Sequence, residues 1–158
     1  MTRVCNVSMT VNGETISQPV SVRMNLVDFL RNEVGLTGSH VGCEHGVCGA
    51  CTIEVDGVAI RGCLMLAVQA DGATVTTIEG LADRATGKAL QTAFQKHNAL
   101  QCGFCTPGML ASAVEYVDSG KPADRKAIRA HISGNYCRCT GYQSIVDAIA
   151  EVVAEVSS

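Results

Sequence analysis

Residues 42–51 have the sequence Gly-Cys-Glu-His-Gly-Val-Cys-Gly-Ala-Cys, which spaces Cys43, Cys48 and Cys51 as Cys-x4-Cys-x2-Cys. Cys63 follows after eleven further residues. Four thiolates hold the iron of a [2Fe–2S] cluster, and this spacing is the plant-type ferredoxin pattern. The interleaved glycines are Gly42, Gly46 and Gly49. Because glycine allows positive φ and close approach of the backbone, N–H groups in such a loop can point at sulfur. The stretch predicts a cluster-binding loop, to which a strand pair returns Cys63.

Four more cysteines form a second quartet, in which Cys102 and Cys105 come first and Cys137 and Cys139 follow later. Thr106-Pro107 predicts that a helix starts directly after the first pair, with the threonine as N-cap and the proline at the first helical position. The second pair precedes the last predicted helix. The free N–H groups and the dipole of a helix N-terminus lower the pKa of a nearby thiol and favour anionic sulfur. Two such N-termini are therefore expected to cradle a second cluster.

Three other interpretations of the quartets stay open at this point. Structural zinc ligands are usually paired as Cys-x2–4-Cys on both sides of the site, whereas the first quartet has one such pair and Cys137-x-Cys139 has an uncommon spacing. Disulfides are rare in reducing compartments. A thioredoxin-like redox pair at Cys102 and Cys105 would require a strand before the pair and a helix after it. It would not be expected to have two further cysteines downstream, as this chain does. A zinc-stabilised interaction module is the competing function from a different class.

The first part of the chain has the pattern of a β-sheet. Apolar residues alternate from Cys5 to Val11, as in a half-buried strand. Asn12-Gly13 predicts a hairpin turn into a partner strand at Ile16–Val22, where Pro19 indicates an edge strand or a bulge. Asn25 is the expected N-cap of a short helix that ends at Gly35. Further strands are expected at residues 51–55, 58–61 and 74–78. This pattern favours an α+β sheet of the β-grasp type.

From about Gly87 the apolar period becomes helical. The expected helices carry Leu90 and Phe94, run from Thr106 to near Gly120, carry Ile128 and Ile132, and run from Tyr142 to Val156. Gly80–Gly87 is the expected connection. The sequence thus predicts a plant-ferredoxin-like β-grasp domain over residues 1–80, followed by an all-α helical bundle domain over residues 87–158. Each domain contains one cysteine quartet.

Composition limits the function classes. The chain has 158 residues, a formal charge of −3 and no basic run, which argues against a nucleic-acid partner. No stretch approaches the ~20 apolar residues of a membrane span. Residues 1–7 alternate apolar and polar side chains, which predicts a strand rather than a signal peptide. With no export signal, a reducing, cytoplasmic location is expected, where clustered cysteines are more often metal ligands than disulfides.

Several residues that could bind metal have simpler interpretations. Cys5 is the one cysteine outside the quartets, and its place beside Val7 and Met9 on a strand predicts a buried apolar residue. His45 would be a fifth ligand in the first loop and is expected to be solvated. The other histidines, His40, His97 and His131, have no ligand spacing between them. Arg138 could balance cluster charge or make a surface contact.

Three runs together resemble one known family. They are residues 42–51, Gln101-Cys-Gly-Phe-Cys-Thr-Pro-Gly108 and Cys137-Arg-Cys-Thr-Gly-Tyr142. In this order they resemble the small iron–sulfur subunit of the molybdenum hydroxylases, the xanthine oxidase family, which includes carbon monoxide dehydrogenases and quinoline-type and aldehyde oxidoreductases. The resemblance spans nearly the whole chain, and no ligand position departs from it.

The resemblance implies two [2Fe–2S] clusters in an electron-transfer subunit of an oxidoreductase. Electrons would pass from a large molybdopterin-binding subunit to a medium FAD-binding subunit, in a dimer of heterotrimers. It also implies that Gln101 and Cys139 lie beside the pterin, with Cys139 both a ligand and an exit point for electrons. The chain has no Gly-x-Gly-x-x-Gly fingerprint and is too small to house both a molybdopterin and a substrate pocket, so catalysis is expected on the partners. The alternative is a stand-alone two-cluster ferredoxin.

Overall fold

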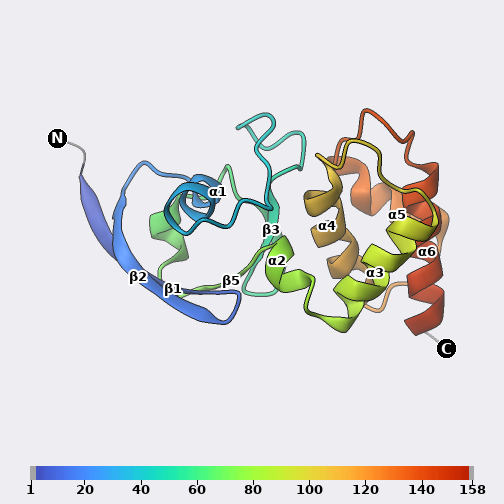
Figure 1. The fold of residues 1–158 in the computed structure, drawn as a ribbon, viewed down its shortest axis with the longest axis horizontal. Helices are drawn as coiled ribbons and strands as arrows, with labels where there is room; N and C mark the ends of the chain where they lie inside the picture. Colours follow the sequence, from blue (N-terminus) through green and yellow to red (C-terminus); the bar gives the residue numbers. More distant parts are fainter. Residues whose placement is uncertain (1–2, 157–158) are drawn as a thin grey trace.

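The computed structural model describes residues 3–156, in which a five-stranded sheet lies beside a group of helices (Figure 1). The strands are β1 (Val4–Val11), β2 (Glu14–Ser21), β3 (Thr52–Val55), β4 (Val58–Arg61) and β5 (Thr74–Thr76). Their order in the sheet is β2-β1-β5-β3-β4. β1 and β5 are parallel, and the other neighbours are antiparallel. Because β2 is the outermost strand, Pro19 lies on an edge, as the sequence predicts.

The alternation in β1 gives the strand one buried face. Val7, Met9 and Val11 are each 2% exposed. The prediction that Cys5 shares their burial is wrong, since Cys5 is exposed. Cys5 lies beyond the buried part of the strand, in which Val7 is the first buried residue and only Thr10 and Val11 pair with β5.

A short helical segment covers the sheet. It consists of α1 (Leu26–Asp28) and a π-helical continuation, η1 (Phe29–Glu33). The Asn25 side chain caps it by accepting from the N–H of Asp28 at 2.8 Å, and Gly35 at φ +83° follows its end. The apolar residues of this segment are fully buried against the sheet, which confirms the expected helix. A 3₁₀ turn, η2 (Ala67–Ala70), completes this half.

The connection between the halves is shorter than expected. β5 ends at Thr76 rather than Ile78, because the Asn12 side chain bonds both the N–H and the hydroxyl of Thr77 and ends the strand there. Helix α2 (Ile78–Leu81) follows at once, and α3 (Ala85–Lys96) begins two residues before Gly87. Gly87 therefore lies inside a helix. A Cβ there would be 1.9 Å from the Leu81 carbonyl oxygen, so this glycine permits close packing instead of ending the connection.

The helical half is built around α4 (Thr106–Asp118), with α5 (Arg125–His131), the 3₁₀ turn η3 (Ile132–Gly134) and α6 (Gln143–Val156) around it. Helix α4 packs against β3 and β4 on one side and against α3 and α6 on the other (Figure 1). Two expectations are corrected. Cys105, not Thr106, is the N-cap of α4, and the hydroxyl of Thr106 has no partner. Ile132 lies beyond the end of α5, in η3.

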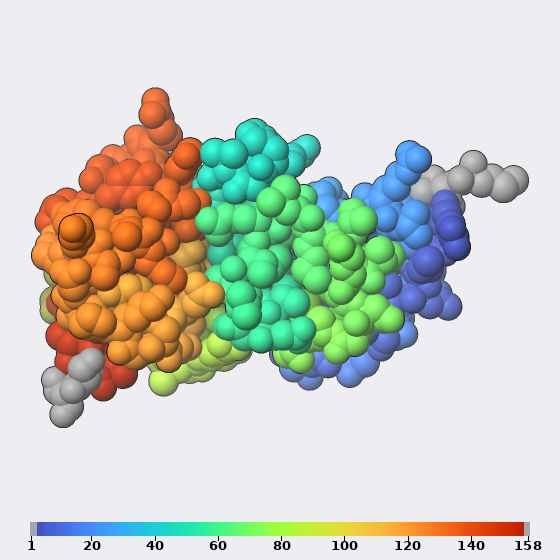
Figure 2. Space-filling model, turned by 180° about the vertical axis from the view of Figure 1, so that it is seen from behind, coloured from blue at the N-terminus to red at the C-terminus, as the bar shows by residue number. Residues whose placement is uncertain are grey.

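Two separate hydrophobic cores result. The buried apolar residues of one lie between positions 7 and 75, and those of the other between positions 81 and 153. Seen from behind, the loop around residues 40–50 (teal) lies directly beside the helical half (orange), and the two halves form one continuous surface (Figure 2). Within residues 3–156, no helix has the length and apolar content needed to span a membrane.

Candidate metal centres

The first quartet lies where the long loop after η1 enters the β3–β4 hairpin. Cys43 and Cys48 are in the loop, Cys51 directly precedes β3, and Cys63 follows β4. The hairpin brings the last two together, since Gly62 donates its N–H to the Cys51 carbonyl oxygen at 3.1 Å. Burial raises the pKa of the Cys51 thiol to about 11; the N–H of Cys63 acts against this rise, and the neighbouring Cys63 thiol adds to it. The strand pair thus returns Cys63 to the loop, as the sequence predicts.

Backbone N–H groups in this loop point at sulfur. Cys48 donates its N–H to Cys43 Sγ at 3.4 Å, and Ala50 donates to Cys48 Sγ at 3.5 Å. The N–H of Cys48, followed by that of His45, lowers the pKa of the Cys43 thiol to about 6. Such donors stabilise a thiolate because they favour its charged form.

The three glycines of the loop do not play the same role. Gly46 and Gly49 have φ of +82° and +74°, as expected. Gly42 is not at positive φ; it permits close approach, because a Cβ there would be 3.1 Å from Cys48 Sγ. The expectation of positive φ is therefore wrong for Gly42 alone.

The second quartet brings together two segments that are far apart in the sequence. Cys102 and Cys105 lie just before α4, while Cys137 and Cys139 lie in the turn before α6. The Sγ atoms of Cys102 and Cys139 are 3.6 Å apart, and the thiols of Cys105 and Cys137 are close enough for each to shift the pKa of the other. The four cysteines line a cavity of about 130 Å³, together with Phe104, Tyr136 and Arg138.

The thiol pKa values in this quartet only partly follow the helix-terminus expectation. Burial favours a raised pKa at Cys137, but donors from the Thr140 hydroxyl and from the N–H groups of Cys139 and Thr140 outweigh it, and the pKa is lowered. At Cys105 the expected lowering is wrong. Burial, followed by the neighbouring Cys137 and Cys102 thiols, raises the pKa of Cys105 to about 12. Burial and neighbouring thiols favour the protonated, neutral form of a thiol, whereas a bound cation favours the thiolate.

The residues present fit binuclear clusters better than single ions. Within residues 3–156, no three or more His, Cys, Asp or Glu side chains are grouped as a ready metal site. The eight thiols instead meet in four close pairs, and none of the nine cysteines forms a disulfide. A [2Fe–2S] cluster has two irons and four thiolates, so it needs two pairs at each site. The chain could hold one cluster at each quartet.

The remaining predicted residues are placed as follows. Gln101 and Cys139 are both exposed, and the structure brings them together, since Gln101 Nε2 donates to the Cys139 carbonyl oxygen at 3.0 Å. His45 is exposed, as expected for a solvated residue, and Arg138 is also exposed. His97 bonds Glu151 at 2.9 Å, while His131 bonds the Ser112 carbonyl oxygen at 3.0 Å. Neither of these two histidines contacts a cysteine in these bonds.

Sequence reasoning missed the residues that join the two quartets. The N–H of Tyr136 donates to the carbonyl oxygen of Cys48 at 2.8 Å. His40 stacks on Phe104 with ring centroids 4.7 Å apart, which also links the two halves. Asn135 and Arg61 make further bonds across the same boundary. The sequence carries no signal for these contacts beyond the position of Asn135 and Tyr136 just before a ligand candidate.

Family models and known proteins agree with this geometry. A model described as a 2Fe-2S iron-sulfur cluster binding domain matches residues 9–76, and one described as a [2Fe-2S] binding domain matches residues 77–150. The gamma subunit of caffeine dehydrogenase from Pseudomonas sp. strain CBB1 is 54% identical over 153 residues, covering 92% of this chain and 89% of the relative. The small subunit of nicotine 6-hydroxylase from Paenarthrobacter nicotinovorans is 47% identical, with coverage of 96% and 92%.

The chain belongs to the small iron–sulfur subunits of the molybdenum hydroxylases. A chain of quinoline 2-oxidoreductase from Pseudomonas putida 86 superposes on this small subunit with a TM-score of 0.89 at 49% identity, covering 98% of this chain and 96% of that one. Aldehyde oxidoreductase from Desulfovibrio gigas gives a TM-score of 0.87 at 39% identity, but only 17% of that chain is covered. These matches confirm the expected family, the α+β fold class with its two [2Fe–2S] binding domains, and membership of an oxidoreductase complex.

Proposed function

We propose that this small subunit accepts electrons from a large molybdopterin-binding subunit and passes them to a medium FAD-binding subunit. Each [2Fe–2S] cluster supplies one-electron chemistry when bound. The reaction on the substrate would take place on the molybdopterin-binding partner, because the two cysteine quartets of this chain suit the binding of clusters that transfer single electrons. The ferredoxin-like domain over residues 1–80 and the helical domain over residues 87–158 would each bind one cluster.

The thiol pairs support a specific ligand set. In the first site, Cys43 and Cys48 would hold one iron and Cys51 and Cys63 the other. In the second site the pairs would be Cys102 with Cys139 and Cys105 with Cys137. The Sγ atoms of Cys102 and Cys139 are already 3.6 Å apart, and the thiols of the other pairs lie close enough to shift each other's pKa, so binding the metal would need little movement of the backbone.

The observation that carries the proposal is the hydrogen bond between Tyr136 and Cys48. The carbonyl group of Cys48, a ligand in the first site, accepts from the amide of the residue directly before Cys137, a ligand in the second site. One hydrogen bond and a few covalent bonds therefore connect the two thiol sets. This connection suits a chain that conducts electrons between two centres, and two unrelated zinc sites would gain nothing from it.

Exposed apolar residues surround both sites and support docking to partners. Val47 and Leu64 beside the first site are 45% and 62% exposed, and Phe104 and Tyr136 beside the second are 48% and 52% exposed. Apolar and aromatic side chains in one region of a surface mark protein interfaces. We propose that the second site, with Gln101 and Cys139 at its surface, faces the pterin, and that the first faces the flavin subunit.

The assembly would be a dimer of heterotrimers in the cytoplasm. The proposed location rests on the nine free cysteines, which suit a reducing compartment. The subunit composition rests on the family and on the small-subunit relatives.

The complex purified from its host tests the proposal. We expect about four iron and about four sulfide per small subunit, together with co-purifying molybdopterin-binding and FAD-binding chains. Gln101→Ala should slow reduction of the clusters by the substrate of the complex, assayed with caffeine, nicotine and quinoline, and leave reduction by dithionite unchanged. Gln95→Ala, an exposed glutamine on α3, is the control.

Two outcomes would replace the proposal. A monomeric chain that co-purifies with nothing, and in which Gln101→Ala changes no rate, would favour a stand-alone two-cluster ferredoxin. Substantial zinc in place of iron, in a colourless protein, would favour an interaction module.

A further inference from the structure

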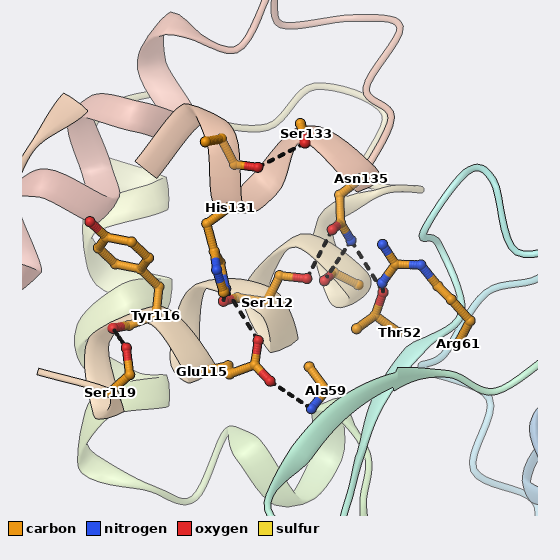
Figure 3. Close-up of polar contacts among 12 residues, drawn as sticks. Thr52, Ala59, Arg61, Ser112, Glu115, Tyr116, Ser119, His131, Ser133 and Asn135 are labelled. Atoms are coloured by element: carbon orange, nitrogen blue, oxygen red, sulfur yellow. Dashed lines mark hydrogen bonds and ion pairs between the residues drawn. The ribbon is translucent and has the colours of Figure 1, made fainter. Parts of the chain in front are cut away.

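A buried carboxamide lies between the two halves of the molecule. Asn135 is 2% exposed. Its Nδ2 is 3.1 Å from the Gly49 carbonyl oxygen, 3.2 Å from Thr52 Oγ1 and 3.0 Å from the Gly108 carbonyl oxygen. Its Oδ1 accepts from Ser112 Oγ at 2.9 Å. In Figure 3 the side chain points into the boundary where β3, α4 and the first-site loop, residues 42–51, meet.

The surrounding carbonyl groups fix the orientation of this amide. Carbonyl oxygens of Gly49 and Gly108 can only accept, so the NH2 group has to face them. The Thr52 hydroxyl donates to the Gly49 carbonyl oxygen at 2.6 Å and can therefore accept from Asn135 and from Arg61, whose Nη1 is 2.5 Å away. The side-chain donors in this network have acceptors, and such closed networks specify one arrangement.

The backbones at this boundary are too close for any side chain. A Cβ on Gly49 would lie 2.5 Å from the Gly134 carbonyl oxygen and 2.9 Å from Asn135 Cα. A Cβ on Gly108 would lie 2.2 Å from the Gly49 carbonyl oxygen. Arg61 Nη2 also donates to the Gly134 carbonyl oxygen at 2.8 Å. The segment before Cys137 is thus tied to β4 through Gly134, and to the first-site loop through Asn135 and Tyr136.

The bonds of Asn135 are adjacent to the bond that joins the two thiol sets. Asn135 bonds Gly49, and the next residue, Tyr136, bonds Cys48, the residue before Gly49. A slip of one segment along the other would break both contacts together. We propose that Asn135 is a positioning residue for electron transfer: its amide holds the Tyr136 N–H on the Cys48 carbonyl and so sets the spatial relation of the two sites. This inference rests on the proposed function for its electron-transfer role.

The same interface contains a contact that serves as a control. Glu115 of α4 accepts from the Ala59 N–H of β4 at 2.9 Å and pairs with His131 at 3.2 Å (Figure 3). It crosses between the halves, but none of its bonds involves residues 48–49 or 135–137. Glu115→Ala therefore weakens the interface without removing any bond of Asn135; its one indirect link to that residue runs through His131, whose Nε2 also bonds the Ser112 carbonyl oxygen.

The test uses the full chain loaded with its clusters. Asn135→Asp keeps the shape of the side chain but presents oxygen in place of the NH2 group to two carbonyl oxygens, and Asn135→Ala removes the network. We expect the Tyr136 amide to exchange with deuterium at least about tenfold faster in both variants, because its bond to Cys48 opens locally. Electron paramagnetic resonance of the reduced protein should lose its spin–spin splitting between clusters, with iron unchanged. Glu115→Ala should change neither signal.

The outcomes separate the two claims. If the wild type shows the splitting and the Asn135 variants keep both the splitting and the slow exchange, the inference is wrong. Equal losses in Glu115→Ala would make Asn135 an ordinary interface residue. A wild type without two clusters would refute the proposed function, whereas amide exchange at Tyr136 would still test the positioning. If the Asn135 variants do not fold, Ser112→Ala removes only the Oδ1 partner and is expected to show the same two changes to a smaller extent.

Discussion

Gly108→Ala places a methyl group in the narrowest contact between the two halves. The new Cβ would lie 2.2 Å from the Gly49 carbonyl oxygen and 3.0 Å from that of Ala50. Optimal contacts of carbon are at about 3.5–4.0 Å, so α4 and the loop would have to separate by more than ~1 Å. All of the obstructing atoms belong to the backbone, which has no rotamer with which to avoid the clash.

Two opposing effects set the size of the change. Overpacking of this kind costs about 1–3 kcal/mol, while replacing glycine by alanine in a helix stabilises by up to about 1 kcal/mol. We expect a net loss on the order of 1–2 kcal/mol, which lowers the midpoint of thermal unfolding by about 2–8 °C for a chain of this length. Far-ultraviolet circular dichroism at one fixed heating rate measures it. Ser144→Ala, in the first turn of α6, is the control and should stay close to the wild type.

The direction in which the unfolding temperature of Gly108→Ala changes shows whether overpacking or helix propensity dominates. If Gly108→Ala unfolds at the same temperature as the wild type or at a higher one, helix propensity dominates, and the close contact between α4 and Gly49 does not hold in solution.

Two further predictions concern the second site and the helical half. Cys102→Ser should lower iron from about four to about two per chain, and the half that contains the sheet should stay folded and keep the spectrum of its own cluster, because the ligands of each site lie in one half and ligation contributes local folding energy. Cys5→Ser, at an exposed cysteine outside the quartets, is the control and should change nothing. Loss of both clusters in Cys102→Ser would contradict the assignment of one site to each half. Hydrogen bonds from Lys96, followed by His97, hold the pKa of the Glu151 carboxyl below its ordinary value in the folded state. A carboxylate with a lowered pKa stabilises the fold; this stabilisation is complete above the ordinary carboxyl pKa of about 4.3 and is lost as the pH falls through the lower folded value. Glu151→Gln should therefore unfold at a lower temperature than the wild type at neutral pH, with a difference that narrows on acidification, and an offset that stays constant with pH would show that the ion pair contributes nothing.

Much of the local structure could be predicted from the sequence. The Asn12-Gly13 turn, the alternation in β1 and the apolar stripe of α6 depend on neighbours two to four residues apart, which the sequence displays directly. The two cysteine quartets were also evident from their spacing, although the sequence left zinc, disulfide and thioredoxin-like interpretations open. The errors fall where other parts of the molecule intervene. Cys5 lies beyond the part of β1 that the core buries, and Gly87 lies inside α3, where its lack of a side chain permits the close approach of Leu81.

The sequence by itself determined which residues are available as ligands and which half of the chain contains each quartet. Only the tertiary structure decided how the thiols pair and how the two sites are joined. Cys102 meets Cys139, and Asn135 meets Gly49, across sequence separations of 37 and 86 residues. Periodicity records which face of an element is buried, but it does not record what buries that face. Backbone contacts such as Tyr136 to Cys48 involve no side chain at all, so no residue type could announce them.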